Sequence, residues 1–162
     1  MGLSREEIHQ IVKEKLGEGV LEDHADAPEP FIVIRPEVME DLAFFVRDDP
    51  RLRFDLLSAI TGVDYPDRSV IEVIYCLDST AHKHWLVVKA ALPREDPRIH
   101  TVERVWRTAD WHERETFDLL GVVFEGHHNL IRILCAEDWV GHPLRRDYVM
   151  PETYRGIKNV IY

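Results

Sequence analysis

Three consecutive stretches with the pattern of β-strands constrain the fold of this chain most. They are RFDLLSAITGVDY, SVIEVIYCL and HKHWLVVKAALP, which together occupy residues 53–93. Each is rich in β-branched and apolar residues, and the first ends in the turn-forming sequence DYPD. The middle stretch is apolar on both alternating faces, which is typical of a central strand. The short connections between the three favour an antiparallel meander.

Helical patterns precede these strands. Residues 4–16 combine a capping box, formed by Ser4 and Glu7, with apolar residues at helical spacing, and this predicts a first helix. The sequence FIVIR, residues 31–35, predicts a short strand. A second helix is expected from Pro36 to the DDP sequence that follows it.

Helical patterns also follow the strands. Residues 96–111 return to a helical period, and the charged sequence DWHERETFDLLG continues this helix or forms another that ends at Gly121. The order is therefore helices, consecutive strands and then helices. This order predicts an α+β fold in which a mixed or antiparallel sheet packs with helices over residues 1–138.

The composition narrows the class of protein. The chain has 162 residues, 45% of them hydrophobic, with a formal net charge of -10, so we expect one globular domain that does not bind nucleic acid non-specifically. Its two cysteines, Cys76 and Cys135, form no C-x-x-C pair, so the chain alone offers no iron–sulfur or cysteine-based zinc framework. Apolar runs stay well below the roughly 20 residues of a membrane span. We expect a cytoplasmic protein that reaches a membrane only through a partner.

The C-terminal segment differs from the rest of the chain. Residues 141–162 carry four basic and two acidic residues, whereas the first 140 carry 16 basic and 28 acidic. The segment has no clear period, yet disordered tails normally lack large apolar groups. We therefore predict that residues 139–162 form an extended partner-binding tail; packing back on the domain is the alternative. Its large apolar residues are Tyr148, Met150, Tyr154, Ile157, Val160, Ile161 and Tyr162.

The charged sequence DWHERETFDLLG begins like the helix of a zinc hydrolase. Such a helix needs a second histidine four residues after His112, but Thr116 stands there. The charges alternate with large apolar residues, so little of the helix is free to face water. Carboxylates and a guanidinium near a core must pair with each other or with backbone groups. A solvated charged helix and an acid–base site are the alternatives, although no nucleophile can be named beside them.

His127 and His128 are candidate metal ligands with Glu113 or Glu115. Adjacent histidines point in different directions, however, so structural hydrogen bonding is favoured over metal binding. The two arginines that follow the Gly-His-Pro turn could bind an anion or an acidic protein surface. The chain contains neither G-x-G-x-x-G nor G-x-x-x-x-G-K, so the sequence makes no case for a bound nucleotide or flavin.

The run ERETFDLLGVVFEGHHNLIRILCAEDWVGHPLRRDY, residues 113–148, resembles the 30-kDa, or C-type, subunit family of NADH–quinone oxidoreductase, respiratory complex I. The family pattern is E-R-E, an aromatic residue, D, two apolar residues and G, then F-x-G-H-P, L-x-R-I-L, D-W and G-x-P-L-R-K-D. An ordered match of this length is specific. The matching residues are Glu113, Arg114, Glu115, Asp118, Gly121, Phe124, Gly126, His127, Leu130, Arg132, Asp138, Trp139, Gly141, Pro143, Leu144, Arg145 and Asp147.

Three positions depart from the pattern. His128 stands where the family usually has Pro, Ile131 where it often has Arg, and Arg146 where it usually has Lys. The resemblance implies no catalytic site in this chain. It implies signature and interface roles for Glu113, Arg114, Glu115, Asp118, Gly121, Phe124, Gly126, His127, Arg132, Trp139, Pro143, Arg145, Arg146 and Asp147.

The resemblance also implies a place in a larger assembly. It implies a peripheral-arm subunit of a proton-translocating NADH–quinone oxidoreductase, on the cytoplasmic face of the bacterial inner membrane, in contact with the D (49-kDa type) and B subunits. The chain itself would hold no cofactor, while NADH, FMN, iron–sulfur clusters and quinone are used in other subunits. Related subunits occur in membrane-bound hydrogenases and other dehydrogenase complexes, which are the alternative parents.

We interpret the charges of this helix as structural. Glu113, Arg114, Glu115 and Asp118 are expected to form a paired charge network that fixes the helix against a neighbouring loop or subunit. Arg114→Ala would leave buried carboxylates unpaired, at a cost of about 3–5 kcal/mol, and would prevent complex assembly. The rival from another class is a metal-dependent hydrolase using His112, Glu113, Glu115, His127 and His128, which tightly held zinc would favour. A free-standing adaptor is a third alternative.

Overall fold

A five-stranded mixed sheet forms the centre of the protein, whose computed structural model describes residues 2–159. The strand order is β1-β2-β5-β4-β3, and every pair is antiparallel except β2 with β5. The predicted meander of three long strands is confirmed, because β4 lies between β3 and β5. The strands are β1 Val20–His24, β2 Phe31–Ile34, β3 Leu56–Tyr65, β4 Val70–Ser79 and β5 His84–Pro93.

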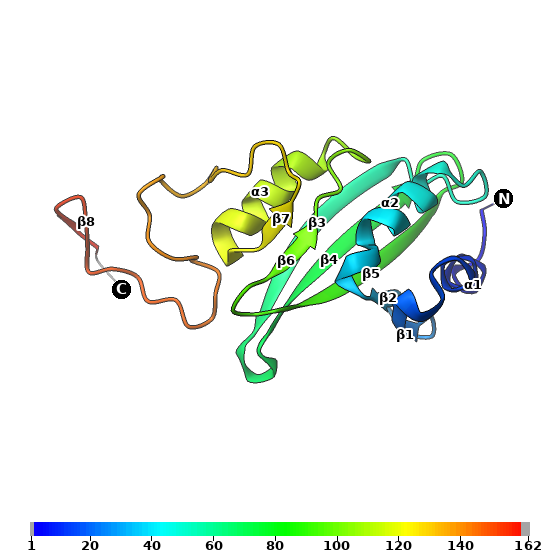
Figure 1. The fold of residues 1–162 in the computed structure, drawn as a ribbon, viewed down its shortest axis with the longest axis horizontal. Coiled ribbons are helices and arrows are strands. Elements are labelled where there is room, and N and C mark those ends of the chain that lie inside the picture. The colour runs from blue at the N-terminus through cyan, green and yellow to red at the C-terminus, as the bar shows by residue number, and fades with distance from the viewer. Residues whose placement is uncertain (1, 160–162) are drawn as a thin grey trace.

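Helices complete the α+β fold that the sequence predicts. Figure 1 shows α2 and α3 in front of the strands, over the same face of the sheet. On β4, Ile71, Val73, Tyr75 and Leu77 are buried under this face, whereas Ile74 and Cys76 on the other face are only half-buried. The helices are α1 Arg5–Leu16, α2 Met39–Asp48 and α3 Ala109–Leu120, with short 3-10 turns at Gly17–Gly19, Pro36–Val38 and Pro66–Arg68.

The N-terminal predictions hold closely. Ser4 caps α1, its hydroxyl accepts from the Glu7 N–H at 3.2 Å, and the Glu7 carboxylate accepts from the Ser4 N–H at 2.7 Å. Ile8 and Val12 on α1 are buried in the common core. Strand β1 is not predicted from the sequence, because four of its five residues are exposed and polar groups interrupt any alternation.

The expected helix over residues 96–111 is wrong. Residues Arg98–His100 form strand β6, which pairs in parallel with β7, Val123–Glu125, and α3 begins only at Ala109. Ile99, Val102 and Trp106 are all buried, so their spacing of three and four residues imitates a helix face. In fact a strand followed by turns places these three side chains on one side. Gly121 ends α3, as the sequence predicts.

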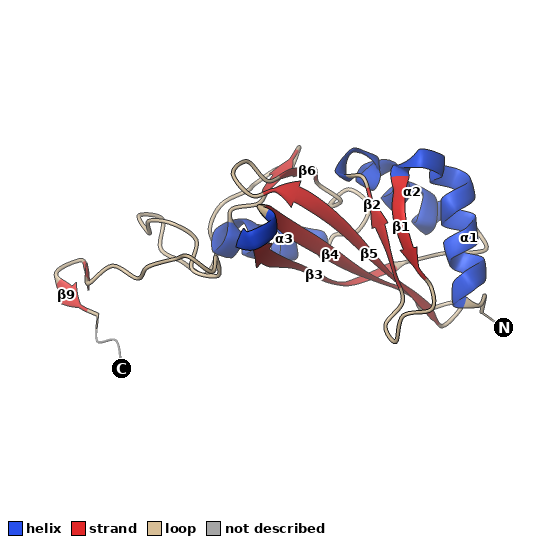
Figure 2. Ribbon diagram, turned by 90° about the horizontal axis from the view of Figure 1, so that it is seen from below, coloured by secondary structure: helices blue, strands red, loops and turns tan. Residues whose placement is uncertain are grey.

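Beyond α3 the chain has little regular structure. Figures 1 and 2 show the C-terminal segment leaving the body of the domain and reaching the small hairpin of β8, Thr153–Tyr154, and β9, Ile157–Lys158. That this segment binds a partner stays a prediction; Val160, Ile161 and Tyr162, which that prediction included, lie outside the described residues. None of the helices in residues 2–159 is long and apolar enough to cross a lipid bilayer.

Candidate functional site

Helix α3 carries the charged signature and packs closely on β3. A Cβ at Gly62 of β3 would collide with the side chain of Leu120, so the absence of a side chain lets the helix approach the sheet. Six α3 residues are buried, and four of them are polar or charged: Glu113, Arg114, Thr116 and Asp118. The partners of these buried groups define the site.

Asp118 organises the loop that follows β7. Its Oδ2 accepts hydrogen bonds from three consecutive backbone N–H groups, those of Ile133 at 3.0 Å, Leu134 at 2.7 Å and Cys135 at 2.8 Å. Its Oδ1 accepts from Arg132 Nη1 at 2.7 Å. Burial works to raise the pKa of Asp118, but these donors outweigh it and hold the pKa at about 2. The buried carboxylate is therefore charged and fully bonded.

The C-terminal end of α3 is capped by the segment 132–145. Helix ends leave carbonyl groups without partners inside the helix. The Asp118 carbonyl accepts from Arg132 Nη1 at 3.1 Å and lies 3.0 Å from His142 Nδ1. The Leu119 carbonyl accepts from the Leu144 N–H at 3.0 Å, and the Leu120 carbonyl accepts from Arg145 Nε at 2.7 Å. Arg132 also donates to the Gly141 carbonyl at 3.0 Å, which ties the two halves of the segment together.

A second tie fastens the same segment to the sheet. Asp64, buried at the end of β3, accepts from Arg94 Nε at 2.7 Å and from the Arg146 N–H at 2.9 Å. Arg94 also pairs with Asp147. The hydrogen bonds from Arg94 lower the pKa of Asp64 despite its burial. Neither Asp64 nor Arg94 is predicted from the sequence as a site residue, since they lie outside the signature and their pairing joins residues 30 positions apart.

The paired network expected within α3 is wrong in its partners. Arg114 donates to the Ile131 carbonyl at 3.3 Å and lies over the ring of Trp111, 5.0 Å from the centroid. Glu115 is exposed. The buried carboxylates instead pair with backbone groups and with Arg132, the other option for charges near a core. Arg114→Ala would therefore leave Glu113 and Asp118 with their bonds intact, and the large cost expected from the sequence does not apply.

Glu113 is the second buried carboxylate of α3. It accepts from the Val102 N–H at 2.7 Å and bonds with the Thr101 hydroxyl. Burial raises the pKa of Glu113 to about 7, against the opposing effect of these two hydrogen bonds. The helix is thereby joined to the turn after β6.

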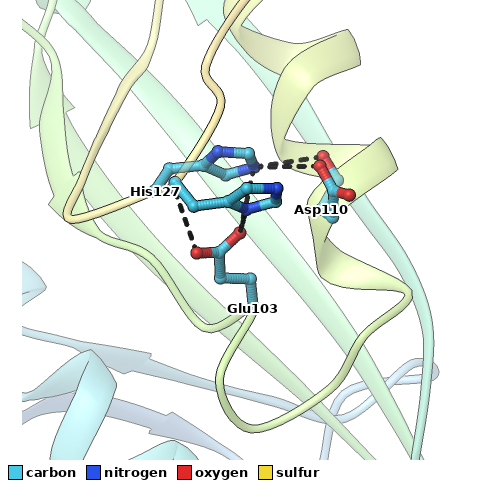
Figure 3. Close-up of side chains that lie close together, drawn as sticks. Glu103, Asp110 and His127 are labelled. Carbon is cyan, nitrogen blue, oxygen red and sulfur yellow. Dashed lines mark hydrogen bonds and ion pairs between the residues drawn. The ribbon is translucent and has the colours of Figure 1, made fainter.

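His127 lies beside this group, with Glu103 below it and Asp110 to one side (Figure 3). Its Nε2 is 3.3 Å from Asp110 Oδ1, 3.5 Å from Glu103 Oε2 and 3.9 Å from Glu113 Oε2. His128 Nδ1 is 2.7 Å from Glu103 Oε2. In the described part of the chain, the potential metal ligands that gather here are Glu103, Asp110, His127 and His128, so His112, Glu113 and Glu115 of the hydrolase hypothesis are not in the set.

The remaining signature residues support the backbone. Phe124 is buried and pairs across from Ile99, and Gly126 turns the chain at a φ of 81°. Trp139 packs on Tyr154, with ring centroids 4.9 Å apart, and Asp138 accepts from the Tyr154 hydroxyl at 2.7 Å. Pro143 is half-buried in the turn before Leu144. These contacts give the tail a defined path.

Several large apolar side chains of the segment are open to solvent. Val140 is 82% exposed, Val149 84% and Ile157 72%. Ile131, Leu134, Leu144, Met150 and the nearby Trp111 belong to the same exposed set. We call residues 131–157 the C-terminal arm.

Comparison with known proteins places this architecture. The family model described as the respiratory-chain NADH dehydrogenase 30-kDa subunit matches residues 32–154, which include the sheet from β2 onward, α3 and most of the C-terminal arm. The chain belongs to this family.

Relatives within the family are close. The chain is 46% identical to the C-type subunit of the NADH-quinone oxidoreductase of Chloroherpeton thalassium, over 94% of its own length and 64% of the relative's. It is 42% identical to the corresponding subunit of Chlorobium phaeobacteroides, over 93% of its own length and 92% of the relative's. The chain thus spans just under two thirds of the first relative and nearly all of the second.

Solved structures agree with the family. A chain of the membrane-bound sulfane sulfur reductase, an archaeal respiratory membrane complex, is similar with a TM-score of 0.75 and 26% identity, over 90% of this chain and 85% of that one. A trypsin-resistant fragment of Nqo5 is similar with a TM-score of 0.62 and 28% identity, over 79% of this chain and 100% of the fragment. The α+β fold is therefore that of the family.

Proposed function

We propose that this chain is the C-type subunit of a proton-translocating NADH–quinone oxidoreductase and serves as a docking subunit of its peripheral arm. In this role it supports assembly with the D and B subunits and, through them, electron transfer from NADH to quinone. The chain would carry no flavin or iron–sulfur cluster, which other subunits supply together with the NADH and quinone sites. Its association with the cytoplasmic face of the bacterial inner membrane would be indirect.

One observation carries the proposal: the C-terminal arm exposes large apolar side chains while its base is bonded to the domain. Asp118 and Asp64 hold the base at residues 132–146 through backbone and arginine contacts. Interfaces that persist have apolar centres, and exposed apolar groups are a cost unless a partner covers them. The names of the relatives support NADH–quinone oxidoreductase as the assembly.

The test compares the arm with an equivalent apolar residue elsewhere. A tagged full-length chain in its host is expected to co-purify with membrane-bound NADH oxidation and with the D and B subunits. Exchanging Val140 and Val149 for Ser should lower that recovery at least tenfold while leaving the free energy of unfolding within about 0.5 kcal/mol, since both side chains are exposed. Leu21→Ser on β1, also exposed, is the matched control and should leave recovery unchanged.

Three results would contradict the proposal. If the Val140 and Val149 double variant recovers the D and B subunits as well as Leu21→Ser does, the arm does not dock. Recovery of partner subunits without NADH oxidation would point to another parent complex. The similarity to the sulfane sulfur reductase chain favours, as that second parent, a related membrane-bound complex such as a hydrogenase. A chain recovered alone would favour the free-standing adaptor.

A further inference from the structure

The histidine cluster beside α3 is not used by the contacts that hold the C-terminal arm. It brings together Glu103 from the turn after β6, Asp110 from the first turn of α3, and His127 and His128 from the loop after β7. One ligand atom from each of the four residues lies within 4.8 Å of the others. The side chain of His127 is fully buried, so its ring is fixed by packing.

The cluster contains an acceptor that its own donors do not satisfy. His127 Nε2 faces three carboxylates, those of Asp110, Glu103 and Glu113, at 3.3, 3.5 and 3.9 Å. Asp110 Oδ1 is closed off from solvent and accepts no hydrogen bond from the described residues. A buried acceptor without a partner is costly, and a cation would satisfy it. An open hollow gives access from solvent, and it is lined by Glu103, Arg104, Arg107, Asp110, Trp111 and His128.

We propose that this cluster binds one Zn²⁺ ion through Glu103 Oε2, Asp110 Oδ1, His127 Nε2 and His128 Nδ1. Two imidazole nitrogens and two carboxylate oxygens suit zinc in tetrahedral geometry. With bonds of about 2.1 Å, the edges of such a tetrahedron measure roughly 3.4 Å. The distances from His127 Nε2 to Asp110 Oδ1 and Glu103 Oε2, 3.3 and 3.5 Å, already match that edge.

Zinc binding would release one proton and move another within its ring. Glu103 Oε2 and His128 Nδ1 lie 2.7 Å apart in a hydrogen bond, and the proton of this bond would leave to solvent when the metal binds. His127 Nδ1 accepts from the Asn129 N–H at 3.0 Å, so the proton of the neutral ring resides on Nε2, 3.3 Å from the Asp110 carbonyl oxygen. Zinc at Nε2 moves this proton to Nδ1 and requires the Asn129 N–H to turn to solvent, where Asn129 is already exposed. Binding therefore weakens at low pH.

The site is structural rather than catalytic. Four protein ligands leave no coordination position for a reactive water, unlike the three-ligand sites of zinc hydrolases. The ion would join the turn at Glu103, the start of α3 and the loop after β7, which are otherwise linked here by hydrogen bonds. The proposal concerns these residues alone, so its failure would leave the docking function as it stands.

The test uses the full chain without a histidine tag. After equilibration with ZnCl₂ at pH 7.5 and dialysis, elemental analysis is expected to show one zinc per chain, and Co²⁺ in its place should give the visible absorption of a tetrahedral site. Titration against a chromophoric chelator measures affinity. His128→Gln and Asp110→Asn should each weaken binding at least tenfold. His24→Gln is the matched control, because His24 pairs with Glu22 on the exposed face of β1.

Two further measurements separate ligand loss from misfolding. Circular dichroism of each variant should match the wild type, and the exposed position of His128 makes that variant safe for the fold. In the zinc form, NMR should show the His127 proton on Nδ1. If the wild-type chain retains no zinc, or if His128→Gln and Asp110→Asn bind as tightly as the wild type, the assigned site is wrong.

Discussion

At the residue scale, the two buried carboxyl groups of α3 have pKa values that are shifted in opposite directions. Asp118 accepts three N–H groups and an arginine, and stays charged with a pKa of about 2. Glu113 accepts fewer hydrogen bonds, and burial raises its pKa to about 7. The sequence could identify both as signature positions and could show that they need partners. It could not name those partners, because they come from loops whose path depends on the whole fold.

Asp118→Ala is expected to lower the free energy of unfolding by about 3–5 kcal/mol, because four donors lose a buried charged acceptor. Chemical denaturation at pH 7 measures this value. Glu115→Ala, an exposed carboxylate on the same helix, is the control and should stay within about 0.5 kcal/mol. Similar effects of the two substitutions would refute the central role of Asp118.

Glu113 predicts a pH dependence of stability. The pKa of its folded form, about 7, lies above the ordinary 4.5, so the folded chain holds a proton that the unfolded chain has released between these values. The stability from this proton is present below pH 4.5 and lost as the pH rises to 7, a fall of roughly 3 kcal/mol at most. Glu113→Gln has no carboxyl proton to lose, so the free energy of unfolding of this variant should not show the fall. The free energy of unfolding of both proteins is measured by chemical denaturation from pH 4.5 to 8. The same change with pH in both would contradict the raised pKa of Glu113.

At the element scale, α3 depends on how its C-terminal end is closed. Gly121 has a φ of 80°, and a Cβ there would lie 2.6 Å from His142 Nε2. The helix pattern and the glycine stop are visible in the sequence. The structure of residues 96–111 is not, because the buried Ile99, Val102 and Trp106 repeat a helical spacing although a strand and turns carry them. The spacing of apolar residues indicates which side chains are buried. Here a helix and a strand followed by turns would bury the same three side chains, so the spacing does not distinguish them.

A comparison of Gly121→Ala with Gly126→Ala separates the cost of backbone strain from the cost of crowding against neighbouring side chains. For Gly121→Ala we expect a loss of about 2–4 kcal/mol in the free energy of unfolding, from the left-handed φ together with the displaced His142 and Arg145 side chains. Gly126→Ala shares nearly the same φ, 81°, but its Cβ would meet only Thr101 Cγ2 at an ordinary 3.6 Å. It should lose only about 1–3 kcal/mol. Equal losses, measured by thermal and chemical denaturation, would show that the contact with His142 has no energetic role.

At the scale of the whole molecule, the α+β class, the meander and the apolar character of the arm could all be predicted. The parallel pairing of β2 with β5, which makes the sheet mixed, could not, because it joins strands about 55 residues apart without a local signal. The Asp64–Arg94 tie to Arg146 was missed for the same reason. Local patterns specify elements, whereas long-range polar pairs decide where the arm begins.

The three consecutive amides held by Asp118 have a consequence for recognition. Because the chain from Arg132 to Asp147 is fastened before any partner arrives, the arm leaves the domain in a direction that is already set. A loose polypeptide loses conformational entropy when it is captured, and that loss subtracts from affinity. The fastened residues incur this loss during folding, so a partner that binds the arm, as we propose, would meet a preorganised ligand.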